Sequence, residues 1–476
     1  MKNKIQLITY INRIGCKNIN EFRDLINTDL KGLFGGVHIL PFFYPYDGED
    51  TGFDPINHKE IDSRLGNWKD INLLSKDIDI MADLIVNHIS AKSYEFKNFI
   101  EKGKKSKYSD LFLTYDSVFP KGASKKELSM IYRPRPGNPF TRFNFKDGTQ
   151  KKIWTTFTSN QIDINVNSNP GIRYLEKIID IFHQYGIKII RLDAVGYSIK
   201  KRKTNCFMIN ETFDFIEQLT EKAKKKSIKV LVEVHSHYKT QIKIAKKVDY
   251  IYDFALPVLV LDTIFNKNSE NLKKWLQISP RNIFTVLDTH DGIGIMDVSS
   301  EEDMPGLIDD QKLHKIINKI HKNTNNQSIK ATGDSAQNLD LYQINCTYFD
   351  ALARDETAYL IARAIQFFIP GIPQIYYVGF LAGTNDMSLL KSTNVGRDIN
   401  RHYYSKSEIK KCLKKPFIKN LIKLMKDRNS HKAFEGEFHL IRSSSNIFNV
   451  RWVNNNHEAE LFINLDKLKM RVKLSK

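Results

Sequence analysis

Short apolar segments recur along this 476-residue chain, and the intervals between them are long enough to hold helices. The segments are rich in Ile, Val and Leu, which is typical of buried parallel strands. They cover residues 5–10, 36–43, 80–88, 187–195, 230–235, 250–257, 282–291 and 372–379. About eight such strands alternating with helices predict an α/β fold, the (β/α)₈ TIM barrel.

Amphipathic stretches provide candidates for the helices between these strands. Residues 174–185, 212–226 and 357–368 carry apolar side chains at helical spacing. Each stretch can therefore bury one face against the barrel and leave the other in water.

Two intervals are too long to be simple loops. Residues 89–166 contain several prolines and little helical periodicity, which predicts a small inserted domain after strand three. Residues 292–349 predict a long loop insertion after strand seven. Residues 433–476 alternate apolar and polar side chains, which predicts a short C-terminal antiparallel β domain. The barrel is then expected to comprise residues 1–88, 167–291 and 350–432.

The formal net charge of the chain is +19. A basic surface can attract nucleic acid, membranes or anionic substrates. Here the lysines are spread along the whole chain, and no nucleic-acid-binding motif accompanies them. We therefore expect no nucleic acid and no membrane among the partners.

The cysteine pattern and the N-terminus bear on the compartment. The four cysteines are scattered and form no CxxC pair and no zinc-ligand spacing. The apolar run at residues 5–10 is too short for the core of a signal peptide. No segment has about 18 uninterrupted apolar residues, so no membrane span is expected. These features together predict a cytoplasmic protein with reduced thiols.

Ionisable side chains stand at the ends of several predicted strands. Asp193, Glu233 and Asp291 end three of them, and Arg191 precedes Asp193 by two residues. A single acid there is usually a helix cap or part of a surface ion pair. Several acids at one rim of a barrel destabilise a fold unless function requires them, so the rim is the expected active site.

A pair of carboxyl groups flanking a scissile bond is what glycoside chemistry needs. One must be ionised to attack the anomeric carbon, and the other must carry a proton for the leaving oxygen. We expect Arg191 to hold Asp193 ionised, because a nearby cation lowers the pKa of a carboxyl group. Glu233 follows an apolar strand, which favours its protonated form.

Four short signatures, at residues 83–88, 191–195, 233 and 290–291, resemble those of the α-amylase superfamily, glycoside hydrolase family 13. The resemblance implies that Asp193 is the nucleophile and Glu233 the general acid/base. It implies that Asp291 stabilises the transition state, and that His88 and His290 bind the glucosyl ring.

Further segments resemble the sucrose phosphorylases within that family, at residues 36–43, 52–55, 132–137, 338–343 and 396–404. This resemblance covers residues 1 to about 428. It implies a retaining double displacement in which sucrose and inorganic phosphate give fructose and glucose 1-phosphate. It implies that these small molecules are the partners. We expect a monomer or homodimer.

The same resemblance implies a pocket for a single glucosyl unit. Asp50 and Arg397 would hold the 4-hydroxyl side and close the pocket, and Phe53 and Phe157 would form apolar walls. Gln161 would face the incoming acceptor. The remaining substrate-binding residues implied are Tyr132, Arg191, Tyr197, Val234, His235, Leu341, Tyr342 and Gln343.

Phosphate must be held beside the enzyme's own carboxylates, which requires local positive charge. We expect Arg135 to supply it, because guanidinium binds phosphate through two hydrogen bonds. Asp340, on a second loop, would repel phosphate and favour fructose. The resemblance implies that the two loops exchange between these arrangements.

No cofactor and no metal ion are expected. Amylases of the family often hold calcium near the barrel–insert junction with an asparagine at the position of Asn87, whereas sucrose phosphorylases as a class do not depend on it. Residues 89–166 contain no clear acidic cluster for an oxygen cage.

Several alternatives stay open at this point. The chain could act on sucrose 6′-phosphate, glucosylglycerate or glucosylglycerol, since only acceptor-loop residues separate these phosphorylases. It could be a sucrose hydrolase or transglucosylase on the same site. Two readings from other classes are a non-catalytic barrel used as a scaffold, and a nucleic-acid-binding protein.

Overall fold

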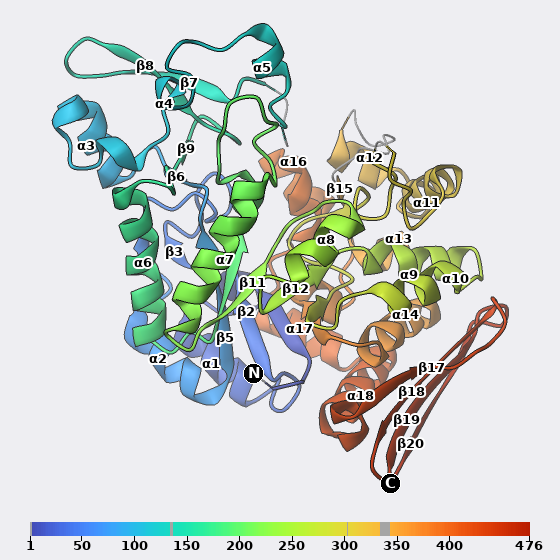
Figure 1. Ribbon diagram of the computed structural model, residues 1–476. Helices are drawn as coiled ribbons and strands as arrows, with labels where there is room; N and C mark the ends of the chain where they lie inside the picture. Colours follow the sequence, from blue (N-terminus) through green and yellow to red (C-terminus); the bar gives the residue numbers. More distant parts are fainter. Residues whose placement is uncertain (1, 134–136, 302, 334–342) are drawn as a thin grey trace.

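Eight parallel strands close into a barrel, which confirms the predicted fold class (Figure 1). The computed structural model describes residues 2–133, 137–301, 303–333 and 343–476. The barrel strands are β1 (Gln6–Thr9), β2 (Gly36–Ile39), β5 (Asp79–Ile85), β10 (Ile189–Asp193), β11 (Lys229–Val232), β12 (Tyr250–Asp253), β13 (Ile283–Thr285) and β16 (Ile372–Tyr376). Each lies within one of the eight predicted apolar segments or exceeds it by one residue.

Most strands are shorter than the apolar segments that predicted them. The segment 250–257 ends in a helix, because only Phe254 and Ala255 separate β12 from α9 (Leu256–Phe265). The segment 282–291 contributes only three residues to β13. As a result, Asp291 lies in the loop beyond its strand, where its side chain can reach a pocket.

Several of the helices around the barrel begin at side-chain caps. The three amphipathic stretches singled out in the sequence are helices in the structure. They are α6 (Asn169–Gln184), α7 (Asn210–Lys224) and α14 (Glu356–Phe368). Ser168 accepts a hydrogen bond from the backbone N–H of Gly171 at the start of α6. The other long helices of the barrel are α1 (Ile19–Asn27), α2 (Trp68–Asp77), α8 (Tyr238–Ala245), α10 (Glu270–Ile278), α17 (Lys406–Leu413) and α18 (Pro416–Ser430).

The segment after β5 forms a separate lobe at the upper end of the molecule in Figure 1. Its strands are β6 (His88–Ser90), β7 (Phe140–Asn144), β8 (Gln150–Trp154) and β9 (Gln161–Asp163), and its helices are α3 (Tyr94–Lys102), α4 (Tyr115–Val118) and α5 (Lys125–Ser129). The helix α3 departs from the expectation of little helical structure. Pairing of β6 with β9 ties the lobe to the barrel.

The segment after β13 is more ordered than the long loop we expected. It contains α11 (Asp310–Asn323) and α12 (Gln327–Thr332), and the short strands β14 (Ile293–Gly294) and β15 (Gln343–Ile344) pair with each other. Leu313, Ile316 and Ile320 are buried on one face of α11. That i, i+3, i+7 spacing was readable in the sequence.

The C-terminal residues form the predicted antiparallel sheet, at the lower right of Figure 1. Its strands are β17 (Glu437–Leu440), β18 (Ile447–Asn454), β19 (His457–Asn464) and β20 (Lys469–Ser475). Phe448, Val450, Leu461 and Ile463 are buried, and β18 and β19 contact α14. The domain limits stated above stay predictions.

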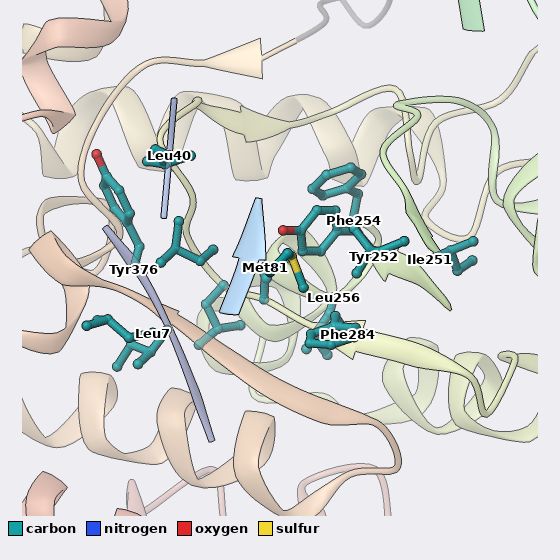
Figure 2. Packing of buried hydrophobic residues seen from close by; sticks show 14 of the residues in the cluster. Leu7, Leu40, Met81, Ile251, Tyr252, Phe254, Leu256, Phe284 and Tyr376 are labelled. Atoms are coloured by element: carbon teal, nitrogen blue, oxygen red, sulfur yellow. The ribbon is translucent and has the colours of Figure 1, made fainter. Parts of the chain in front are cut away.

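The barrel interior becomes polar toward the C-terminal ends of its strands. Figure 2 shows Met81, Tyr252 and Phe284 among the side chains of the apolar core. Two residues beyond Met81, on the same face of β5, the Asp83 carboxylate lies 3.1 Å from Nε2 of His38. In the described part of the chain, no helix combines the length and apolar character needed to cross a membrane.

Candidate active site

A cavity of about 960 Å³ lies at the C-terminal ends of the barrel strands. It is lined by fifteen of the sixteen predicted site residues that the structure describes: Asp50, Phe53, His88, Tyr132, Phe157, Gln161, Asp193, Tyr197, Glu233, Val234, His235, His290, Asp291, Gln343 and Arg397. Arg191 lies behind this lining. Arg135, Asp340, Leu341 and Tyr342 lie outside the described residues.

Arg191 binds three carboxyl groups through its two terminal nitrogens. Strand register places Arg191 beside Asp83 on β5, and Nη1 contacts both Asp83 and Asp193, the latter at 3.1 Å. Nη2 contacts Glu233. Asp193 and Glu233 come from the ends of the neighbouring strands β10 and β11. One guanidinium holds their two carboxyl groups close together.

The pKa of Asp193 is raised well above its ordinary value. Burial is the largest cause, and the nearby charges of Glu233 and Asp83 add to it, while Arg191 opposes the rise. Arg191 thus acts in the expected direction, but burial outweighs it. Because three carboxyl groups share one guanidinium, repulsion between their like charges disfavours the ionised form of Asp193.

The backbone after Asp193 is held in an uncommon conformation. Ala194 has φ of 53°, in the left-handed region that L-residues with a side chain rarely adopt. This turn ends β10 and starts the 3₁₀-helix η4 (Val195–Tyr197). Strain of this kind, about 1 kcal/mol or more, persists where the surrounding structure enforces it, often at functional sites.

A second ionic group joins Asp50, Arg397 and Asp291 across the cavity. Arg397 lies 2.5 Å from Asp50 and 2.8 Å from Asp291. Burial raises the pKa of Asp291. The charges of His290, Arg397 and Arg401 lower this pKa by a larger amount, so the net pKa lies well below its ordinary value. Asp291 is therefore ionised beside the Asp193–Glu233 pair.

Arg401 is a site residue that the sequence analysis missed. It is fully buried, donates to the carbonyl of His290 at 2.8 Å, and lies 3.6 Å from Asp291. It belongs to the same segment, residues 396–404, from which only Arg397 was chosen. The spacing of four residues between two arginines was the available signal.

Aromatic rings form the walls of the cavity. Phe53 stacks on His290 with ring centroids 4.9 Å apart. Phe157 packs edge-on against His88 and Tyr197. Flat apolar faces of this kind suit the C–H surface of a sugar ring.

Gln161 lies among the residues predicted to bind the glucosyl unit. Its Nε2 is 3.2 Å from Asp50 and 3.0 Å from Nε2 of His88. It therefore contacts two residues predicted to bind the glucosyl unit, and its role toward the acceptor stays a prediction.

His235 is held by a buried carboxylate that the sequence analysis did not identify. Its Nδ1 lies 2.7 Å from Asp297, and its Nε2 lies 3.2 Å from Nε2 of Gln343. A Cβ on Gly294 would lie 2.2 Å from Asp297, so this approach requires glycine. Burial lowers the pKa of His235, but Asp297 and other carboxylates raise it to a net value above the ordinary one.

The position implied for calcium does not fit a metal ion. The side-chain oxygen of Asn87 lies 3.2 Å from the Lys200 ammonium, which also pairs with Asp163 at 2.9 Å. Elsewhere in the described residues, Glu233, His290 and Asp291 have ligand atoms within 4.8 Å of one another. Arginines already contact both acids of that group.

The α-amylase catalytic-domain family matches residues 30–417 of the chain. This match covers most of the barrel and both insertions. The chain belongs to the α-amylase family.

Within this family, the chain is similar to curated phosphorylases over its full length. It is 51% identical to the sucrose phosphorylase of Agrobacterium vitis, covering 100% of this chain and 98% of that protein. It is 48% identical to the sucrose phosphorylase of Bifidobacterium adolescentis, covering 97% and 92%. The crystal structure of sucrose 6F-phosphate phosphorylase from Thermoanaerobacter thermosaccharolyticum matches with a TM-score of 0.91 and 39% identity, covering 100% and 96%.

Proposed function

We propose that this α-amylase-family chain is a retaining phosphorylase that converts sucrose and inorganic phosphate to α-D-glucose 1-phosphate and D-fructose. The observation that carries the proposal is the grouping of Asp193, Glu233 and Asp291 around one cavity, with two of the acids on one guanidinium. Identities of 51% and 48% to two sucrose phosphorylases support sucrose as the substrate.

The first chemical step forms a covalent intermediate. A carboxylate oxygen of Asp193 attacks C1 of the glucosyl unit, and the bond from C1 to the fructosyl oxygen breaks. Glu233 gives its proton to that oxygen, so fructose leaves neutral. Asp291, whose low pKa keeps it ionised, stabilises the positive charge that develops on the ring.

The second step releases the product with retained configuration. A phosphate oxygen attacks C1 from the side that fructose vacated, and the ester bond to Asp193 breaks. Glu233 takes up the proton that the attacking phosphate loses. Phosphate is already partly ionised near neutral pH, so it depends less on this base than water does.

A coupled assay tests the proposal. We expect glucose 1-phosphate and fructose in equal amounts from sucrose and phosphate, and little product without phosphate. Release of glucose and fructose regardless of phosphate would identify a hydrolase. Faster turnover of sucrose 6′-phosphate, glucosylglycerol or glucosylglycerate would identify a related phosphorylase, an alternative suggested by the sucrose 6F-phosphate phosphorylase neighbour.

Arg397→Ala should weaken sucrose use strongly. The substitution leaves Asp50 and Asp291 without the cation that bridges them, and we propose that this bridge closes the pocket behind the glucosyl unit. Loss of one partner of a buried charge pair typically costs about 2–5 kcal/mol, so we expect kcat/KM for sucrose to fall about 100-fold. Arg23→Ala, which breaks the exposed pair with Asp77, is the control and should leave kcat/KM within a factor of two.

Arg135 remains our candidate for phosphate binding. Arg135→Ala should slow phosphorolysis about tenfold more than hydrolysis of sucrose, because only phosphate needs the guanidinium. Arg133, which lines the cavity, provides a comparison at the same loop. If Arg135→Ala slows both reactions equally, the phosphate is held elsewhere, and the response of Arg133→Ala shows whether its guanidinium is that site.

The predicted cytoplasmic location is supported by the four cysteines, all of which are unpaired.

A further inference from the structure

Lys200 is enclosed where the barrel meets the inserted lobe. Its side chain is 1% exposed, and that of its partner Asp163 is 0% exposed. Lysine is almost never buried to this extent without a partner, because the ammonium loses its hydration. The environment of Lys200 must therefore replace water.

The three donors of the ammonium each meet an oxygen atom. Nζ lies 2.9 Å from Asp163 Oδ2 and 3.2 Å from Asn87 Oδ1, and it donates to the backbone carbonyl of Tyr197. It also lies over the ring of the fully buried Trp154, 5.4 Å from the centroid. An ammonium has three donors, so its capacity is filled.

The oxygens come from three segments that adjoin the cavity. Asn87 precedes His88, and Tyr197 itself lines the cavity. Asp163 is paired with His88 in the β6–β9 register, two residues after Gln161. A shift of any of the three oxygens would therefore displace a pocket residue.

We propose that the Lys200 ammonium is a built-in cation that takes the place of a metal ion at this junction and positions the inserted lobe against the sugar pocket. Lys200 is thus a positioning residue. The three oxygens around Nζ favour a single positive charge, because only one of them belongs to a carboxylate. Calcium takes six to eight oxygens, and three are present around Nζ.

The remaining contacts of Asp163 leave no room for metal ligation. Its Oδ1 accepts from the backbone N–H of Thr156 at 3.0 Å and from the side-chain amide of Asn87 at 3.2 Å. Its Oδ2 accepts from the Thr156 hydroxyl at 2.5 Å as well as from Lys200. These bonds orient the carboxylate toward the ammonium.

Thermal unfolding tests the proposal on the intact protein. We expect the Tm of the wild type to differ by less than about 1 °C between EDTA and 2 mM CaCl₂, and elemental analysis to find no stoichiometric calcium. Lys200→Met keeps the side-chain length but removes the charge, and should lower Tm by roughly 5–10 °C. Lys201→Met is the matched control, because Lys201 is 57% exposed and pairs with Glu211 at the surface.

A second substitution separates the charge from simple loss of packing. The double variant Lys200→Met/Asp163→Asn removes the carboxylate that Lys200→Met leaves uncompensated, so its Tm should lie above that of Lys200→Met. Equal Tm loss for Lys200→Met and Lys201→Met would overturn the proposal. So would a Tm of the wild type that falls in EDTA, or a double variant less stable than Lys200→Met.

The positioning role has a kinetic readout, which rests on the proposed function. Measured well below its Tm, Lys200→Met should raise KM for sucrose about three- to tenfold and change kcat less, because the displaced residues bind the sugar. A lower kcat at unchanged KM would refute positioning. An inactive wild type would contradict the proposed function only, since the Tm and calcium measurements do not use turnover.

Discussion

Asp193→Asn lowers kcat for sucrose phosphorolysis by about 10⁵-fold, the scale of loss seen when an enzyme nucleophile is removed. The amide cannot attack C1, and it carries no charge to stabilise the ring. A better leaving group does not replace the missing nucleophile, so the variant should also be inactive with α-glucosyl fluoride as the donor. The measurement is release of glucose 1-phosphate under saturating sucrose and phosphate.

Stability provides the folding control for Asp193→Asn. The pKa of Asp193 is raised in the folded protein, so at neutral pH its ionised form opposes folding, and this cost grows as pH rises above the unfolded-state pKa. Asparagine removes that cost, and Tm should not fall. Asp180→Asn, at an exposed ion pair with Lys226, should keep full activity. Activity within tenfold of the wild type would exclude Asp193 as the nucleophile.

Glu233→Gln gives a loss that depends on the leaving group. With sucrose, we expect kcat to fall about 10³-fold, because glutamine cannot protonate the fructosyl oxygen. With α-glucosyl fluoride and phosphate, the loss should be less than about tenfold, because fluoride leaves without a proton and phosphate attacks without a strong base. Initial rates with both donors check this result.

The contrast between the two variants distinguishes the two carboxyl groups. A residue that acts as nucleophile is needed for every donor, whereas a general acid is needed only for a poor leaving group. Glu176→Gln, at an exposed pair with Lys222, controls for the loss of a glutamate charge. If Glu233→Gln lost activity equally with both donors, or kept its activity with sucrose, the assigned roles would be wrong.

The strands were predictable because burial between helices leaves a local signature. Each barrel strand is a short β-branched or apolar run, so all eight lie at the predicted segments. Their ends were less predictable. The apolar residues of 250–257 continue into α9, since a buried strand end and a buried helix start look alike in a sequence.

The helices after β13 were not predicted, for a different reason. Pattern alone favoured a long loop for residues 292–349, yet α11 buries Leu313, Ile316 and Ile320. Its polar face carries most of its residues, which hid a short apolar stripe. A count of i, i+3 and i+7 positions would have found it.

The acids of the active site were predictable from their places at the ends of strands, since parallel strands of a barrel deliver their C-terminal residues to one rim. Their electrostatics were not. Arg191 was expected to lower the pKa of Asp193, and it does so, but burial acts more strongly. The balance depends on the distances between several charges and their exposure, which no local pattern contains.

The sequence by itself determined the barrel strands, through their apolar periodicity, and the acids at the strand ends, and its short signatures carried the resemblance to the family. All of these features depend on neighbours a few residues apart. The folded arrangement was needed to pair Lys200 with Asp163, Asp297 with His235, and Arg397 with both Asp50 and Asp291. These partners lie 37 to 347 positions apart in the chain. Only strand register and loop closure bring them together, and both are properties of the complete fold.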